Sequence, residues 1–327
     1  MKAGQVSQTV YRRSIQKKLH IDKETALFVP SQAEMCSGIS SSHGDIVVHC
    51  QNTVWGNAVE LPVFAAARGA NALASRGAEI KGISLQFLLP ESTEEEHLRK
   101  MMEQASAAAD REGFEILGAE AQVIPGMKIP AVCANAAGTA ADIRVQSRYA
   151  QPEQEIVLLK WIGLEGMLRV KREREKELAS YFAPSFLYQM EQYQEELFSV
   201  RETFLAAAMG VSAIHPVGEG GIFAALWNLA ETAGIGMTVD MKKISVRQET
   251  IEVCELFHLN PYQLAGTGAM LAVTPKGEEM ADALKQEGVC AEVIGRTHKS
   301  KERVLLKGSE KRYMDRPAPD EFTRLFE

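Results

Sequence analysis

The sequence lacks the features that mark membrane, secreted and nucleic-acid-binding proteins. Its 327 residues contain no run near the roughly 20 apolar residues that span a bilayer, and the first residues lack the apolar core of a signal peptide. Lysine and arginine number 36 against 43 aspartates and glutamates, so the formal net charge is −7 and no general basic surface exists for a phosphate backbone. We therefore expect a cytoplasmic protein that binds neither membrane nor nucleic acid.

Cysteine is also scarce, and no two cysteines form a CxxC pair. The five are Cys36, Cys50, Cys133, Cys254 and Cys290. An odd count at wide spacing argues against a disulfide framework and against a zinc ribbon, so we expect five separate core thiols in a reducing compartment. The motifs GxxxxGK[ST], GxSxG and HExxH are missing too, which excludes a Walker loop, a nucleophile elbow and a zincin helix.

What the sequence does contain is an alternation of short apolar runs and amphipathic segments, typical of an α/β protein. The length favours two domains, and the polar, proline-interrupted segment 146–154 predicts domains over residues 1–150 and 151–327. The serine- and glycine-rich segment 37–44 is expected to be a loop. Strands are expected near residues 45–50, 83–89, 114–123, 129–137, 155–161, 211–215, 237–240, 269–273, 291–295 and 303–307.

Two glycine-rich turns at predicted strand-to-helix junctions are candidate phosphate sites. They are Gly163–Gly166 and Gly218–Gly221. The first amides of a helix have no internal partner, and glycine lets a phosphate approach them. His215 precedes the second turn and Glu219 lies within it, which makes that turn the better candidate. The alternatives are a plain tight turn, a structural histidine and an acid that only favours the helix dipole.

Two further polar residues lie in small, apolar surroundings. Asn71 falls in a predicted helix over residues 58–76, where a structural hydrogen bond is the alternative to a ligand contact. Glu120 falls in an apolar strand, where a carboxylate needs a partner or water. Both are therefore candidates for a binding site.

Taken together, the chain resembles the aminoimidazole-ribotide (AIR) synthase-related superfamily and, within it, the branch of the hydrogenase-maturation carbamoyl dehydratase HypE. The likeness is strongest over 211–222 (VSAIHPVGEGGI), 226–236 (LWNLAETAGIG), 244–247, 254–257, 260–261, 268–273 and 293–296, and in the first half at 71, 77–78, 88–90, 118 and 125–126. The resemblance implies a mixed N-terminal sheet with helices, a C-terminal α/β domain, and a homodimer with a shared barrel. It also implies ATP between the domains, magnesium held by aspartates, and phosphoryl transfer.

Several positions depart from the family pattern, and most of them lose an acid. Residues 38–44 replace a glycine-rich acidic loop, 51–52 are Gln-Asn near an expected aspartate, 71–72 are Asn-Ala in place of Asn-Asp, 118–121 are Gly-Ala-Glu-Ala in place of Gly-Gly-His-Thr, and 215–216 are His-Pro in place of His-Asp. Magnesium prefers anionic oxygen ligands. Asp45, Glu120 and Glu219 are the acids left near these positions. The segment 322–327 has no cysteine, so we expect no HypE-type carbamoyl carrier.

The leading hypothesis is a HypE-like protein that binds ATP or another phosphorylated small molecule between the domains. The residues expected to contact it are His215, Glu219, Gly163, Gly166, Gly218, Gly220 and Gly221 from the second domain, and Asn52 and Asn71 from the first. Glu219, Glu120 and Asp45 would hold magnesium, and His215, Glu219 and Glu120 would carry any ATP-dependent phosphoryl transfer.

Two other functions remain open. One is a non-catalytic homodimeric scaffold that acts through a metabolic or hydrogenase-assembly protein partner, which the missing carboxylates favour. The other is a small-molecule kinase of the thiamine-phosphate type, against which the lost acidic loop weighs.

Overall fold

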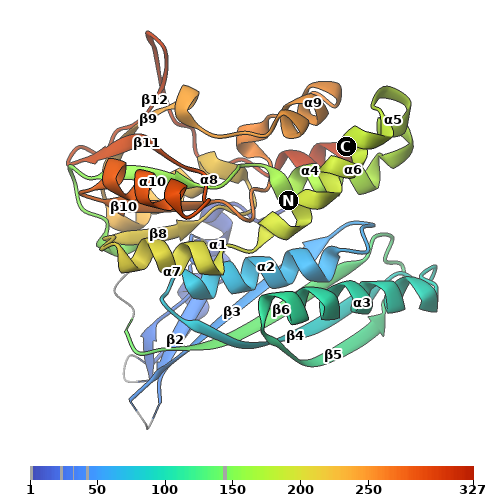
Figure 1. Cartoon of the computed structure of the whole chain (residues 1–327). Helices are drawn as coiled ribbons and strands as arrows, with labels where there is room; N and C mark the ends of the chain where they lie inside the picture. The colour runs from blue at the N-terminus through green and yellow to red at the C-terminus, as the bar shows by residue number, and fades with distance from the viewer. Residues whose placement is uncertain (1–2, 23–24, 32, 42–43, 143–145) are drawn as a thin grey trace.

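Two β-sheets, one from each half of the chain, form the framework of the molecule (Figure 1). The computed structural model describes residues 3–22, 25–31, 33–41, 44–142 and 146–327. The first sheet has the strand order β1-β2-β3-β6-β4-β5, and the second has the order β13-β12-β9-β11-β7-β10-β8. Both sheets are mixed, because β4 pairs with β5 and β9 with β12 in parallel within otherwise antiparallel sheets. The α/β class expected from the sequence is confirmed.

The first half supplies six strands and three α-helices within the described residues. The strands are β1 (Ala26–Phe28), β2 (Cys36–Ser40), β3 (Ile46–Trp55), β4 (Glu79–Leu89), β5 (Glu115–Val123) and β6 (Ala131–Ala140). The helices are α1 (Gln8–Ser14), α2 (Leu61–Ala74) and α3 (Glu95–Glu112), with short 3₁₀ turns η1 (Gln16–Lys18) and η2 (Ser147–Tyr149). The expected domain boundary at residue 150 falls between β6 and β7 (Glu155–Leu159), the next strand along the chain.

The second half alternates strands and helices. Its strands are β7 (Glu155–Leu159), β8 (Ala213–Pro216), β9 (Gly236–Asp240), β10 (Met270–Thr274), β11 (Ala291–His298), β12 (Arg303–Lys307) and β13 (Glu310–Tyr313). Its helices are α4 (Leu164–Glu173), α5 (Glu175–Tyr181), α6 (Pro184–Gln192), α7 (Val200–Ala208), α8 (Gly221–Ala233), α9 (Gln248–Leu256) and α10 (Gly277–Gln286), with 3₁₀ turns η3 (Tyr193–Leu197), η4 (Met241–Lys243), η5 (Pro261–Gln263) and η6 (Glu321–Phe326). None of the helices in the described ranges is long and apolar enough to cross a bilayer.

One local expectation is wrong. The segment 37–44 was expected to be a loop, but its first residues belong to β2, which pairs with β3 from Cys36 opposite Cys50 to Ser40 opposite Ile46. Pairing with a β-branched strand overrides the poor strand propensity of glycine and serine. Residues 42–43 of the same segment lie outside the described part of the chain.

Helix α2 lies between the two halves and determines where they meet (Figure 1). Every residue of α2 except Arg68 is buried, because the helix packs on β3 and β6 on one side and on α7 on the other. Its small residues allow this close approach: a Cβ on Gly69 would lie 2.8 Å from the Cβ of Ala136 in β6. One hydrophobic core therefore continues from the first sheet through α2 into α4 and the C-terminal Phe322.

Candidate functional site

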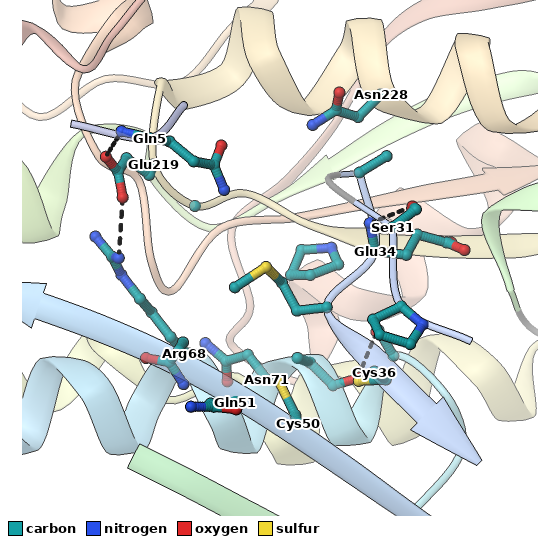
Figure 2. Close-up of a pocket in the computed structure, with 18 of the residues that line it drawn as sticks. Gln5, Ser31, Glu34, Cys36, Cys50, Gln51, Arg68, Asn71, Glu219 and Asn228 are labelled. Carbon is teal, nitrogen blue, oxygen red and sulfur yellow. Dashed lines mark hydrogen bonds and ion pairs between the residues drawn. The ribbon is translucent and has the colours of Figure 1, made fainter. Parts of the chain in front are cut away.

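A cavity of about 690 Å³ lies between the two halves of the chain. Strands β2 and β3 and helix α2 line it from the first half. The segment 215–219, which begins in β8, and helix α8 line it from the second half (Figure 2). Residues 4–6 and 33–37 also contribute to its lining. This volume is in the range of sites that hold small molecules. Of the expected site residues, Asn52, Asn71, His215, Gly218 and Glu219 line this cavity.

The wall from the first half contains two buried polar side chains with unused hydrogen-bonding atoms. Asn52, on the inner face of β3, is 5% exposed, and among the described residues neither its Oδ1 nor its Nδ2 has a partner. Arg76, just after α2, is 2% exposed; its Nη2 lies 2.8 Å from Oε1 of Glu34, but its Nη1 has no partner within the same residues. Buried groups of this kind destabilise a protein unless something pairs with them, so they point to a ligand.

Asn71 lines the same cavity, but its amide already holds the structure together. Its Nδ2 donates to the carbonyl oxygen of Leu197 at 2.8 Å, and its Oδ1 accepts from the amide of Ser199, also at 2.8 Å. These bonds tie α2 to the start of α7. The structural alternative for Asn71 therefore describes its contacts.

His215 lies in β8 and is buried at the cavity. Its Nδ1 is 2.9 Å from Oγ of Ser147, and the amide of Ser147 donates to Glu34. Burial, with a smaller contribution from the nearby Arg76, lowers the pKa of His215 to about 4, although Glu34 opposes the shift. The imidazole is therefore neutral near pH 7 and can offer a hydrogen bond to a ligand, but no positive charge.

In the Gly218–Gly221 turn, the amides of Gly220 and Gly221 already have hydrogen-bond partners within the chain, so they are not free to bind phosphate. The amide of Gly220 donates to Oδ2 of Asp320 at 2.7 Å, and the amide of Gly221 donates to the carbonyl oxygen of Gly218 at 3.1 Å. Asp320 is buried, and this burial together with the neighbouring Glu219 raises its pKa to about 7. Gly220 and Gly221 are not among the cavity-lining residues. A carboxylate from the C-terminal segment thus takes the place expected for a phosphate.

The other glycine turn serves packing. Gly163 precedes α4 with a φ of 73°, and a Cβ on Gly166 would collide with the side chain of Leu264. The amide of Gly166 donates to the carbonyl oxygen of Ala265 at 2.9 Å. Neither glycine lines the cavity.

The three acids proposed as metal ligands do not come together. Glu120 lies on the exposed edge strand β5, where Gln86 and Gln122 donate to it, and Asp45 lies just before β3; neither lines the cavity. The described ranges contain no group of three or more His, Cys, Asp or Glu side chains that could hold a metal ion. Within the described part of the chain, the acids that line the cavity are Glu34 and Glu219, and each pairs with an arginine. This set of donors does not fit magnesium, which proteins usually hold through one or two carboxylates together with waters and substrate phosphates, because both carboxylates here are already engaged.

A buried charge cluster beside the cavity joins the two halves, and sequence reasoning missed it. Arg68 of α2 binds Glu165 of α4 through two hydrogen bonds, at 2.8 and 2.6 Å. Glu165 also accepts from Oγ1 of Thr267 at 2.6 Å and lies 3.3 Å from Arg169. Burial raises the pKa of Glu165, but Arg68 and Arg169 together bring it below its usual value. The only sequence signal was a lone arginine within a small-residue helix.

Arg68 also reaches toward the second wall of the cavity. Its Nη1 lies 3.5 Å from Oε2 of Glu219, whose Oε1 accepts from the amide of Gln5 at 3.2 Å (Figure 2). Arg68 therefore links both walls, and the carboxylate of Glu219 has partners on two sides.

Comparison with known proteins finds a family match in the second half of the chain. Residues 151–307 match the family model described as "AIR synthase related protein, C-terminal domain". This match covers most of the second half of the chain, and the fold of the whole chain is the two-domain AIR synthase-like fold.

The relatives lie in the HypE branch. The chain is 25% identical over 233 residues to carbamoyl dehydratase HypE of Rhodobacter capsulatus, which covers 69% of this chain and 66% of the relative, just under two thirds of its length. In fold, it is similar to HypE in a HypE–HypF complex, with a TM-score of 0.74 at 16% identity over 94% of this chain and 99% of the other. It is also similar to HypE in complex with ATP, with a TM-score of 0.67 at 14% identity over 98% and 97% of the two chains. The resemblance inferred from the motifs is thereby confirmed.

Proposed function

We propose that the cavity binds a phosphorylated small molecule, such as an adenine nucleotide, without a magnesium ion. The observation that carries the proposal is the pair of buried, unpartnered groups on the first wall, Nη1 of Arg76 and the amide of Asn52. The ATP complex of a HypE with the same fold supports a nucleotide as the first ligand to test.

The two groups suit different parts of such a ligand. A guanidinium N–H makes strong, charge-assisted hydrogen bonds to a phosphate oxygen. A free carboxamide offers one acceptor and two donors, which matches the edge of a base or another amide-like group. Neutral His215 adds a further contact from the second wall. The positive charge that a bound phosphate meets is thus an arginine of the chain.

We propose binding rather than phosphoryl transfer as the activity of this cavity. Phosphoryl transfer depends on metal ions and charged groups that neutralise the transferred phosphate. Here the lining carboxylates Glu34 and Glu219 are engaged with Arg76 and Arg68. His215, Glu219 and Glu120 therefore have no catalytic role in this proposal.

Thermal unfolding of the purified protein with ATP, ADP and AMP tests the proposal, each with magnesium and with EDTA. A ligand present at 100 times its dissociation constant stabilises the fold by about 2.7 kcal/mol, which gives a readable melting shift. We expect a shift of the same size in EDTA and in magnesium, and its loss in Arg76→Met. The exposed Arg201→Met is the matched control. No shift with any nucleotide at millimolar concentration would contradict nucleotide binding.

A second candidate is a homodimeric scaffold that works with a hydrogenase-assembly protein. Two observations favour it: the similarity to HypE in a HypE–HypF complex covers nearly the whole chain, and edge strand β5 exposes Leu117 at 61% and Val123 at 59%. Light scattering of the wild type and of Leu117→Glu separates the two states. A dimer that the substitution converts to a monomer supports this candidate, and a wild-type monomer contradicts it.

A further inference from the structure

Two of the five cysteines, far apart in sequence, lie side by side in the cavity wall. Cys36 of β2 and Cys50 of β3 are directly opposite each other in the antiparallel register, and each is 1% exposed. Both residues line the cavity (Figure 2). The expectation of five separate thiols is therefore wrong for this pair, because β2 was not foreseen as a strand.

The remaining thiols have other surroundings. Cys133 contacts Oγ1 of Thr53, and Cys290 contacts Oγ of Ser245. Cys254 is buried in α9, and burial raises the pKa of its thiol to about 12. These three cysteines provide internal controls for the chemistry of the pair.

The register of the pair suits a covalent bond. Residues directly opposite in an antiparallel pair have Cα atoms about 4.5–5.5 Å apart, and disulfides span about 4.4–6.8 Å between Cα atoms. Both side chains are buried on the same face of the sheet, toward α2. A bond between the two sulfurs would therefore need no slip of one strand against the other.

The surroundings of the pair make the pKa values of the two thiols unequal. The neighbouring thiol of Cys50 and the nearby guanidinium of Arg76 lower the pKa of Cys36, although burial opposes this. The neighbouring thiol of Cys36 and burial raise the pKa of Cys50. Thiolates are the reactive form of cysteine, so Cys36 is suited to attack and Cys50 to resolve.

We propose that Cys36 and Cys50 form a redox-active pair that small-molecule disulfides convert into a cross-strand disulfide. The Cys36 thiolate attacks one sulfur of the small disulfide, which breaks the S–S bond, forms a mixed disulfide and releases one thiolate. That thiolate takes the proton of Cys50. The Cys50 sulfur then attacks Sγ of Cys36, forms the Cys36–Cys50 bond and releases the second small thiol after it is protonated. Two electrons pass from the cysteine pair to the small disulfide, for which the cavity has room.

The pair lies beside a group that the proposed ligand would use. Arg76 acts on both thiols, so oxidation replaces two thiols beside its guanidinium with a disulfide. The state of the pair thereby changes the surroundings of the proposed phosphate contact. The redox chemistry itself does not depend on nucleotide binding and is tested separately.

The test treats the folded, full-length protein with 2-hydroxyethyl disulfide, followed by an acid quench, intact mass and non-reducing peptide mapping. We expect a mass lower by two hydrogen atoms, two fewer titratable thiols, a Cys36–Cys50 cross-linked peptide, and full reversal by dithiothreitol. Cys36→Ser and Cys50→Ser should lack the cross-link, whereas Cys133→Ser should keep it.

Each contrary outcome overturns the proposal. An unchanged mass after equilibration contradicts it, as does oxidation confined to Cys133, Cys254 or Cys290. A cross-link in Cys36→Ser contradicts it too. The wild-type peptide map decides by itself if a serine variant does not fold, because the assignment needs only the native chain.

Discussion

The two walls of the cavity differ in how they use their polar groups. On the second wall, Glu219 is held by Arg68 and Gln5, and the amide of the adjacent Gly220 donates to Asp320. On the first wall, Asn52 and Nη1 of Arg76 are buried without partners among the described residues. The turn that carries the strongest family motif bonds to groups of the chain itself, whereas the wall from the first half holds the buried polar atoms without partners among the described residues. The residues that match the family motif are therefore not the residues with unpaired polar atoms that could contact a ligand.

The largest expected effect is at the link between the walls. Arg68→Met leaves Glu165 buried without its bidentate partner, and removal of one partner of a buried ion pair typically costs about 3–5 kcal/mol of unfolding free energy. Urea unfolding measures this loss. The exposed pair Arg201–Glu287 gives the control, for which Arg201→Met should change stability by less than about 0.5 kcal/mol. Equal losses for Arg68→Met and Arg201→Met would contradict the account.

A second expected effect is a pair of opposing pH dependences. Folding raises the pKa of Asp320 from 3.8 to about 7, so the folded state holds the extra proton between these values and stability falls as pH rises through them. Folding lowers the pKa of His215 from 6.5 to about 4, so stability rises with pH between 4 and 6.5. Asp320→Asn should therefore increase the rise of the unfolding free energy between pH 4 and 7 by on the order of 2–3 kcal/mol. His215→Gln should abolish the rise of the unfolding free energy with pH. Urea unfolding across this pH range measures both slopes; identical slopes for wild type and Asp320→Asn would show that Asp320 titrates normally.

A third prediction separates packing from ligand contact in the second wall. A Cβ on Gly221 would lie 2.5 Å from the carbonyl oxygen of Tyr262, and the residue has a φ of 67°, so Gly221→Ala should cost about 2 kcal/mol. Gly218 has open space around it and no positive φ, so Gly218→Ala should stay within about 0.5 kcal/mol of the wild type. Thermal unfolding compares the two. A costly Gly218→Ala with a neutral Gly221→Ala would reverse this assignment.

The smallest expected effect has the opposite sign. Asn52→Leu removes a buried amide without a partner, so the free protein should become more stable by about 1 kcal/mol, while nucleotide affinity falls. Asn71→Leu is the matched control on the same wall, and it should destabilise the protein because two hydrogen bonds are lost. Urea unfolding and calorimetric titration measure the two properties. A destabilised Asn52→Leu with unchanged affinity would mean that Asn52 serves the fold.

The sequence predicted the framework because local patterns carry it. Apolar runs mark the strands, and the motif around Gly218–Gly221 lies within the residues that match the AIR synthase-related family model. Pairings across long distances leave no such pattern. Arg68 meets Glu165 across 97 positions, Gly220 meets Asp320 across 100, and Cys36 meets Cys50 only through the register of a strand that its composition concealed. Whether a polar group such as Asn52 finds a partner depends on packing, which no local rule reports.

The most direct test of the central claim is the ratio of ATP dissociation constants measured by calorimetry in EDTA and in magnesium. We predict a ratio within about threefold of one, because arginine and carboxamide groups rather than a metal ion hold the ligand. Arg76→Met should weaken binding about tenfold or more in both buffers, as expected for loss of a charged hydrogen bond worth about 1.5–3 kcal/mol. Binding that occurs only with magnesium, or that Arg76→Met leaves unchanged, would contradict the account.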